Sequence, residues 1–353
     1  MSVRALAEFF ERRRDDAPGL VLATVYDTKG STYSKAGDRM LVAANGDFQG
    51  MLSGGCLEGD LAERAIQVAK SGRCDAVTYD LREESEDELW GLGVGCEGLM
   101  RIFLQPITIE NDFEPFQSLL AVQLGDTPGA AATVLRDIDG TAAGSSLLHV
   151  DGTWKNFGVA DGHVGGLTTV VTEALRAERS QTVTLSIDDT DVEVLCAFLQ
   201  PTPRVLILGG GLDAEPVLRA VANLGWRACV QDHRPAYIDK GDFAIAERTT
   251  CVPAADLSST FELKRFDAAV VMSHHLDSDR VYLRQLAASD IRYIGLLGPR
   301  DRRRRLLNDL GSDVATALGD RLHGPAGLPL GGRGPAPIAL SIVAEMHQVL
   351  VEA

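Results

Sequence analysis

The stretch from Arg204 to Asp232 places the tightest constraint on the fold of this chain. It reads RVLILGGGLDAEPVLRAVANLGWRACVQD: an apolar strand, three glycines, an amphipathic helix and a second apolar strand. Gly209–Ala214 fits the pattern G-x-G-x-x-A, in which the glycines permit a tight turn and let a phosphate approach the backbone. Asp232 ends the second strand about 20 residues further on, where a carboxylate can bind ribose hydroxyls. This combination predicts a Rossmann-like unit.

Strands and helices continue to alternate further along the chain. DAAVVMS at 267–273 and RYIGLLG at 292–298 are short apolar runs that are typical of buried strands. Such alternation favours a parallel sheet with helices on both faces. We therefore predict an α/β fold, with a Rossmann-like doubly wound parallel sheet over 201–353 that follows the short linker QPTPR.

The residues before this linker divide into two predicted parts. In 1–105, an amphipathic start, alternating runs and an Asn45-Gly46 turn signal predict an N-terminal α+β domain with a hairpin. Apolar residues at helical spacing from Leu57 predict a helix that Gly72 can end. Runs such as GAAATVLRD and VEVLCAFLQP favour strands in 106–200, which we interpret as a β-rich middle segment without a recognisable chemical motif.

Composition argues against several classes of protein. The formal net charge of −16 disfavours nucleic-acid binding, which needs a basic face to neutralise phosphates. The chain has no run of about 18 apolar residues, so we expect no membrane span. The six cysteines are scattered without a CxxC pair, which suits a reducing cytoplasm. The acidic run REESEDE at 82–88 is interpreted as a solvated loop, and the many strand edges favour a homo-oligomer.

Two later strand ends are expected to meet the glycine turn, because ligands of open α/β sheets bind at the carboxyl ends of the strands. SHHLDSDR follows the third strand, and its His274 and His275 could bind a phosphate, transfer a proton or ligate a metal. Alternatively, the two histidines only cap the next helix. Gly298 and Arg300 follow the fourth strand. We expect Arg300 to face an anion, while most of the RRRR run at 302–305 forms a solvated face or an interface.

The helix after the glycines carries two carboxylates, Asp213 and Glu215, in its first turn. They suit the helix dipole, but they would oppose a pyrophosphate seated there. The residues alone therefore leave open whether a nucleotide binds at this turn or the scaffold uses its crevice in another way.

A second glycine turn, MLSGGCLEGD, carries Cys56 directly before a predicted helix. A helix N-terminus favours a thiolate and presents N–H groups to an anion, and Gly54 and Gly55 allow close approach of the backbone. The nearby Glu58 acts in the opposite sense, because a carboxylate disfavours a neighbouring thiolate. Cys56 is thus either a small buried apolar residue or a thiol that faces a ligand, and Cys96 leaves the same choice.

These motifs, in this order, resemble the XdhC/CoxI family of accessory proteins for molybdenum hydroxylases. The N-terminal matches are KGSTYSKAGDRMLV and GMLSGGCLEGDL. The C-terminal matches are the stretch that begins at Arg204, then DAAVVMSHHLDSD, YIGLLGPRDRRRRLL and LHGPAGLPLGG. SGGCLEGD together with YIGLLGPR is far more specific than the glycine pattern, and the middle segment has no match.

The resemblance implies a cytoplasmic chaperone that binds the molybdenum cofactor, supports its sulfuration and inserts it into an apo molybdenum hydroxylase of the xanthine or carbon-monoxide dehydrogenase type. The cofactor would be molybdopterin or molybdopterin cytosine dinucleotide, and further partners would be cofactor-synthesis or cysteine desulfurase proteins. Cys56 becomes a candidate contact to molybdenum, and its thiol forms the candidate catalytic set with His274 and His275. The candidate cofactor-binding residues are Ser53, Gly54, Gly55, Cys56, Glu58, Gly209, Gly210, Gly211, Asp232, Gly298 and Arg300.

The sequence departs from the family pattern at three places. Leu212 stands where the family usually has a histidine, SHHL replaces a THDH-like loop, and TYSKAGD replaces SPRRPGA. Two other functions stay open beside the non-catalytic chaperone that the resemblance favours. One is an NAD(P)-dependent oxidoreductase with His274 or His275 as proton donor, for which Asp232 favours NAD. The other is an assembly scaffold that binds no ligand.

Overall fold

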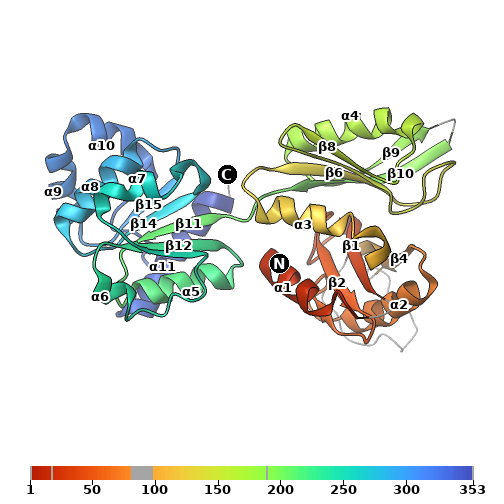
Figure 1. Cartoon of the computed structure of the whole chain (residues 1–353), viewed down its shortest axis with the longest axis horizontal. Coiled ribbons are helices and arrows are strands. Elements are labelled where there is room, and N and C mark those ends of the chain that lie inside the picture. Colours follow the sequence, from red (N-terminus) through yellow and green to blue (C-terminus); the bar gives the residue numbers. More distant parts are fainter. Residues whose placement is uncertain (1, 17–18, 81–97, 188–189, 352–353) are drawn as a thin grey trace. The chain divides into compact units, whose positions relative to one another are not determined.

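The computed structural model describes residues 2–16, 19–80, 98–187 and 190–351. The chain forms two compact units, Met1–Pro201 and Thr202–Ala353 (Figure 1). The predicted acidic loop at 82–88 and Cys96 lie outside the described residues. Within the described ranges, no helix is long and apolar enough to cross a membrane.

The first sheet of the N-terminal unit is antiparallel, with strand order β3-β2-β1-β5-β4. Its strands are β1 (Leu20–Gly30), β2 (Arg39–Ala43), β3 (Phe48–Gln49), β4 (Asp75–Asp80) and β5 (Gly98–Ile107). Helix α2 (Glu58–Ser71) packs on one face, whereas α1 (Val3–Arg13) and α3 (Phe116–Leu124) pack on the other. Because both faces are covered, β1 is buried at seven successive positions instead of alternating. The predicted hairpin and the end of α2 at Gly72 are confirmed.

The second sheet of this unit has the order β8-β7-β6-β10-β9 and is also antiparallel. Its strands are β6 (Gly129–Val134), β7 (Ser146–Val150), β8 (Thr153–Phe157), β9 (Gln181–Ile187) and β10 (Thr190–Leu199). Helix α4 (Asp161–Ala177) covers one face. Side chains of the other face, including Leu148 and Leu195, share a core with Tyr26 and Phe103 of the first sheet.

The C-terminal unit is a six-stranded parallel sheet with the order β13-β12-β11-β14-β15-β16. Its strands are β11 (Arg204–Leu208), β12 (Arg227–Asp232), β13 (Arg248–Cys251), β14 (Ala268–Val271), β15 (Tyr293–Leu296) and β16 (Leu322–His323). Its helices are α5 (Ala214–Asn223), α6 (Pro235–Ile238), α7 (Leu257–Thr260), α8 (Leu276–Ala287), α9 (Arg300–Leu310), α10 (Ser312–Leu318) and α11 (Pro335–Val351). The core on one face includes α5 and α11, and the core on the other includes α7 to α10. The predicted doubly wound fold is confirmed.

The strand order reverses next to β11. The chain runs from β11 outward to β12 and β13, then returns to β14 on the other side of β11 and continues to β15 and β16. Open α/β sheets bind ligands at such a reversal, beyond the carboxyl ends of the strands. The turn after β11 and the loop after β14 therefore border the expected crevice. The edge strands β13 and β16 were not predicted from the sequence.

Candidate functional site

The glycine turn after β11 is held tightly against the end of β14. Gly209 has a φ of +130°, and a Cβ at this position would overlap the carbonyl group of Met272. Only glycine combines this conformation with so close a backbone approach. The N–H of Gly210 donates a hydrogen bond to Oδ2 of Asp232 at 2.7 Å, while Leu212 stands 91% exposed at the tip of the turn.

Asp232 is fully buried, and its carboxylate is saturated by protein donors. Oδ1 accepts from the backbone N–H and from Nε of Arg234, each at 2.9 Å. Oδ2 accepts from Gly210 and from Nη2 of Arg234, each at 2.7 Å. Burial raises the pKa of Asp232, but these hydrogen bonds lower it by more, so the pKa lies below its ordinary value. A carboxylate has about four acceptor positions, so a ribose hydroxyl could bind here only by displacing a protein donor.

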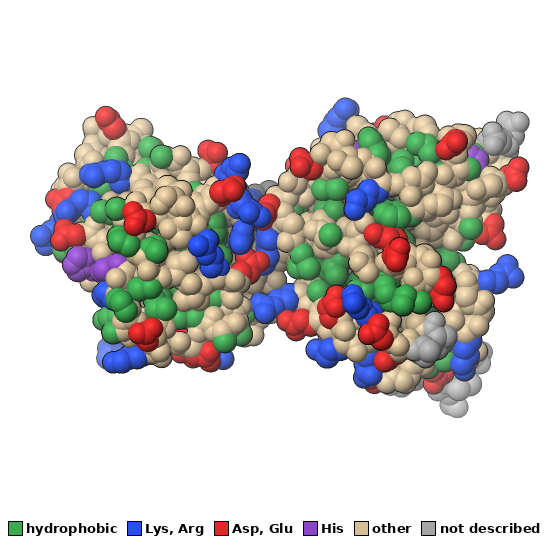
Figure 2. Space-filling model, in the orientation of Figure 1, with side chains coloured by type: hydrophobic (Ala, Val, Ile, Leu, Met, Phe, Trp, Pro, Cys, Tyr) green, Lys and Arg blue, Asp and Glu red, His purple; other side chains and the backbone are tan. Residues whose placement is uncertain are grey.

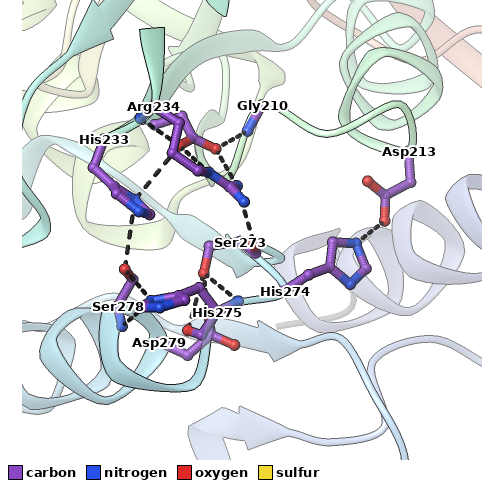
Figure 3. A network of polar contacts seen from close by, with 10 residues as sticks. Gly210, Asp213, His233, Arg234, Ser273, His274, His275, Ser278 and Asp279 are labelled. Atoms are coloured by element: carbon purple, nitrogen blue, oxygen red, sulfur yellow. Dashed lines mark hydrogen bonds and ion pairs between the residues drawn. The ribbon is translucent and has the colours of Figure 1, made fainter. Parts of the chain in front are cut away.

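Arg234 links the glycine turn to the loop after β14. Its Nη2 also donates to the carbonyl oxygen of Ser273 at 2.9 Å (Figure 3). Its guanidinium lies 3.7 Å from the ring centre of Tyr237. The Ser273 hydroxyl donates to Asp279, which is 1% exposed and accepts from Nη2 of Arg302 at 2.7 Å. This chain of polar contacts fixes the ends of β12 and β14 and the starts of α8 and α9. Arg234, Asp279 and Arg302 were not predicted from the sequence, although an arginine two residues after the acid was a usable signal.

The two adjacent histidines have different surroundings. His275 is the N-cap of α8: its ring accepts from the N–H of Ser278 at 3.3 Å and lies 3.0 Å from the Ser278 hydroxyl. His274 has a φ of +57°, and its Nε2 lies 2.7 Å from Oδ2 of Asp213 (Figure 3). The side chain of His274 is 59% exposed. His274 therefore reaches across the glycine turn to the start of α5 and pairs with one of the carboxylates that would oppose a phosphate there.

Gly298 and Arg300 occupy the turn between β15 and α9. Gly298 has a φ of +122°, and a Cβ there would lie 2.5 Å from Cδ of Arg302. Glycine thus leaves the space through which Arg302 reaches Asp279. Arg300 is exposed at the first position of α9, where it lines a groove with Arg303 and other residues of that helix.

In the N-terminal unit, Glu58 organises the second glycine turn. Its side chain is 3% exposed. Its carboxylate accepts the N–H groups of Leu52 and Ser53, both at 2.8 Å, the Ser53 hydroxyl at 2.6 Å and the N–H of Gly55 at 2.9 Å. Burial raises the pKa of Glu58, but the hydrogen bonds from Ser53 and Leu52 lower it by more, so the pKa is lowered overall. Glu58 therefore holds the loop together, and its acceptor positions are in use.

The same loop presents Cys56 one residue before the N-cap of α2. The Ser53 hydroxyl accepts the N–H groups of Cys56 at 3.1 Å and Leu57 at 2.8 Å, so the backbone on both sides of the thiol is fixed. Gly54 and Gly55 adopt φ values of +83° and +108°. Cys56 is partly exposed at the margin of the core beneath α2. The thiol is thus neither fully buried nor carried on a loosely held segment.

The predicted site residues form two groups, one in each unit. Ser53, Gly54, Gly55, Cys56 and Glu58 share one loop of the N-terminal unit. Gly209–Gly211, Asp232, the two histidines, Gly298 and Arg300 lie in the C-terminal unit, at the end of β12 or in the segments that follow β11, β14 and β15. Among the described residues, no group of three or more His, Cys, Asp or Glu side chains could hold a metal ion. The assignment of Cys56 as a molybdenum contact stays a prediction.

Fold and site together define a class of protein with a Rossmann unit, a tightly closed glycine turn and a separate cysteine-bearing loop. Residues 205–346 match the family described as the XdhC Rossmann domain, and residues 15–80 match the XdhC and CoxI family. The chain belongs to the XdhC and CoxI family, as its motifs predicted.

Related proteins of known sequence or structure span nearly the whole chain. The chain is 31% identical over 337 residues to a probable xanthine dehydrogenase subunit from Bacillus subtilis (strain 168), a match that covers 95% of this chain and 94% of the relative. A crystal structure described as a xanthine dehydrogenase from Bacillus halodurans is similar with a TM-score of 0.80 and 29% identity, covering 100% of this chain and 96% of that one. The chain is also 29% identical over 150 residues to the uncharacterized protein YqeB of Escherichia coli (strain K12). This shorter match covers 42% of this chain and 27% of the relative.

Proposed function

We propose that this protein is a maturation factor for a molybdenum hydroxylase of the xanthine dehydrogenase type. In this proposal it binds the molybdenum cofactor in the cytoplasm, supports its sulfuration and inserts it into the apo-enzyme. Membership of the XdhC and CoxI family supports the link, as do the two relatives whose names refer to xanthine dehydrogenase. The observation that carries the proposal is the Ser53–Glu58 loop, because its hydrogen bonds fix a partly exposed thiol in place.

The chemistry of this loop fits a ligand that brings its own metal donors. The described residues around Cys56 include no further set of metal-binding side chains, whereas thiolate sulfur is a soft ligand suited to a metal already held by other groups. When bound, the molybdenum cofactor supplies the metal and the dithiolene sulfurs. Cys56 would contact the metal, or its thiolate would accept the outer sulfur of a cysteine desulfurase persulfide and release the desulfurase thiolate. The backbone at Gly54 and Gly55 would approach the cofactor closely.

In the same proposal, the glycine turn of the C-terminal unit is the candidate site for the phosphate part of a dinucleotide form of the cofactor. A Cβ at Gly211 would lie 2.8 Å from Oδ1 of Asp213 and 3.8 Å from Cδ2 of His274, so these two side chains border the turn and a phosphate there would have to displace the Asp213 carboxylate. His274 contacts the other oxygen of this carboxylate, Oδ2, at 2.7 Å, so a shift of Asp213 towards His274 would open the turn. Recognition of a ribose by Asp232 is not supported in this conformation, because Arg234 occupies the carboxylate. The same contact weighs against use of the turn as an NAD site.

The proposal is tested with protein purified from a molybdate-fed host or reconstituted with molybdenum cofactor. Wild type and the Cys56→Ser and Cys251→Ser variants are denatured, and released pterin fluorescence and molybdenum are measured. Cys251 is an exposed cysteine in β13 and serves as the matched control. We expect wild type and Cys251→Ser to carry cofactor and to activate the apo-enzyme in cells, and Cys56→Ser to lose sulfuration and activation.

Two results would contradict the proposal at different points. If reconstituted wild type releases neither pterin nor molybdenum, the protein does not bind the cofactor. If Cys56→Ser activates the apo-enzyme as well as wild type does, the thiol is not needed for maturation, which favours a scaffold that binds no ligand. Calorimetric titration with NAD and NADH at millimolar concentration is expected to give no heat, and saturable binding would favour the oxidoreductase instead.

A further inference from the structure

One face of α9 forms an arginine-lined groove that the proposed function does not use. Three arginines and one acidic residue line it beside the segment that follows β16, and its volume is about 680 Å³. The lining residues are Arg300, Asp301, Arg303, Arg304, Leu307, Asn308, Gly324 and Pro325. Small-molecule sites commonly measure roughly 300 to 1,000 Å³. Figure 2 shows basic side chains, with acidic ones among them, at the α9 end of the C-terminal unit. The groove is thus of a size and charge suited to a small anionic ligand.

The helical repeat explains why these arginines share a face. Residues three and four apart lie side by side on a helix, so Arg300, Arg303, Arg304 and Leu307 follow one stripe along α9, and all four line the groove. Arg302 points elsewhere, since its guanidinium is paired with the buried Asp279. The groove is therefore built from a set of side chains separate from the polar network at the glycine turn.

Two of the three arginines lack an acidic partner. Arg304 pairs with Asp301 at 3.0 Å, but within the described part of the chain Arg300 and Arg303 take part in no ion pair, although the chain has 50 acidic and only 34 basic residues. Nε of Arg303 is buried without a hydrogen-bond partner, and its Nη2 makes only a long contact of 3.5 Å to the Leu322 carbonyl oxygen. Because Nε is buried, the terminal nitrogens of Arg303 are the donors that an anionic ligand in the groove could use.

Gly324 shapes the wall of the groove around Arg303. A Cβ at Gly324 would lie 2.8 Å from Cδ of Arg303, so any larger residue would displace the arginine stem. The guanidinium is thereby kept between α9 and the segment after β16. Leu307 and Pro325 add apolar surface beside the charged groups.

We propose that this groove binds the phosphoryl group of a small molecule, with Arg303 and Arg300 as the binding side chains. A guanidinium offers paired donors that match two phosphate oxygens. The start of α9 adds the favourable end of the helix dipole, and the one carboxylate of its first turn, Asp301, is paired with Arg304. Leu307 and Pro325 would cover a less polar part of the ligand. Of the residues that line the groove, only Arg300 was predicted to bind the cofactor. The phosphoryl site therefore goes beyond the proposed function and does not depend on it.

Isothermal titration calorimetry at low ionic strength tests the site with four probes: inorganic phosphate, pyrophosphate, CMP and cytidine. The variants are Arg303→Gln and Arg300→Gln, and the matched control is Arg305→Gln, an exposed arginine of the same helix outside the groove. Far-UV circular dichroism and the thermal midpoint verify that each variant is folded. Since Arg300 is exposed, its replacement leaves a folded protein even if Arg303→Gln does not.

We expect pyrophosphate to bind wild type and Arg305→Gln alike, and the groove variants to bind about tenfold more weakly or worse, as for loss of a charged hydrogen bond. CMP that binds more tightly than phosphate, with cytidine inactive, identifies a nucleotide ligand; equal affinities identify free phosphate. Absence of heat with every phosphate probe overturns the proposal. Binding that Arg303→Gln and Arg300→Gln leave unchanged places the phosphate elsewhere, such as the glycine turn, and also overturns it. Because the probes contain no molybdenum, these results are independent of cofactor uptake.

Discussion

At the scale of single residues, three buried carboxylates satisfy donors of the protein itself. Glu58 gathers the loop that carries Cys56, Asp232 gathers the glycine turn and Arg234, and Asp279 joins Ser273 to Arg302. A carboxylate in a sequence motif can either bind a ligand or accept hydrogen bonds from the protein, and the sequence does not distinguish these roles. In the structure, the hydrogen-bond donors to all three carboxylates are groups of the protein.

Replacing Glu58 with glutamine is expected to destabilise the N-terminal unit by about 1–3 kcal/mol at pH 7, because the amide NH2 would replace an oxygen that accepts protein donors. Oε1 accepts the N–H groups of Leu52 and Ser53, and Oε2 accepts the Ser53 hydroxyl and the N–H of Gly55. Urea denaturation of Glu58→Gln against wild type measures the change. Glu63→Gln is the control, since Glu63 is exposed on the same helix. A loss of equal size in both variants would show that the loop contacts contribute nothing specific.

The lowered pKa of Glu58 also makes this contribution pH-dependent. A depressed pKa in the folded state adds stability above the unfolded-state pKa, about 4.3 for Glu, and that stability is lost as the pH falls through the folded-state pKa. The difference in unfolding free energy between wild type and Glu58→Gln should therefore shrink as the pH falls from about 5 towards 3. Urea denaturation curves at several pH values measure this difference in unfolding free energy. A difference that does not change with pH would contradict hydrogen bonding of the loop to an ionised Glu58.

At the scale of elements, the predictable parts are those with strong local periodicity. The β11, α5 and β12 region was predicted because apolar strands, glycines and an amphipathic helix follow one another without interruption. Helix α4 was not predicted, because Gly162, Gly165 and Gly166 have a low helix propensity. In the structure its apolar side chains pack on the second sheet. The short edge strands β13 and β16 were missed because two to four residues carry no measurable alternation.

The turn between β11 and α5 is expected to tolerate no side chain at Gly209. Gly209→Ala combines a positive φ with a Cβ that overlaps the Met272 carbonyl group, whereas Gly311→Ala has a positive φ of 86° and no neighbour within 4 Å. We expect a loss of several kcal/mol in the unfolding free energy for the first and about 1 kcal/mol for the second. Equal losses in chemical denaturation would show that backbone conformation alone, without close packing, requires glycine there.

The buried pair between α8 and α9 should be sensitive to removal of its arginine. Arg302→Gln leaves the carboxylate of Asp279, which is 1% exposed, without its cationic partner, and the expected cost is about 3 kcal/mol. Thermal and urea unfolding measure it, with Arg305→Gln as the exposed control on the same helix. If the additional change Asp279→Asn did not restore part of the loss, the cost would have a source other than the unpaired charge.

At the scale of the whole molecule, the chain builds two units with separate hydrophobic cores. The predicted site residues are divided between the units: Cys56 belongs to the first and the glycine turn to the second. The sequence therefore does not predict whether the two act on the same ligand. The middle segment 106–200 joins the N-terminal unit through a core that contains Tyr26, Phe103, Leu148 and Leu195. Sequence patterns could predict its strands but not this contact, because an apolar face looks the same whichever partner covers it.

This arrangement predicts which pieces of the chain fold alone. Fragments 1–201 and 202–353 should each unfold cooperatively, because each is a compact unit that keeps its own hydrophobic cores. Fragment 1–105 should not, since removal of the second sheet exposes Tyr26 and Phe103, which are buried at 6% and 2% exposure. Circular dichroism during thermal unfolding of the three fragments measures this. A cooperative transition in 1–105 would mean that the first sheet is stable without the second, and loss of it in 1–201 would mean that the N-terminal unit requires the C-terminal one.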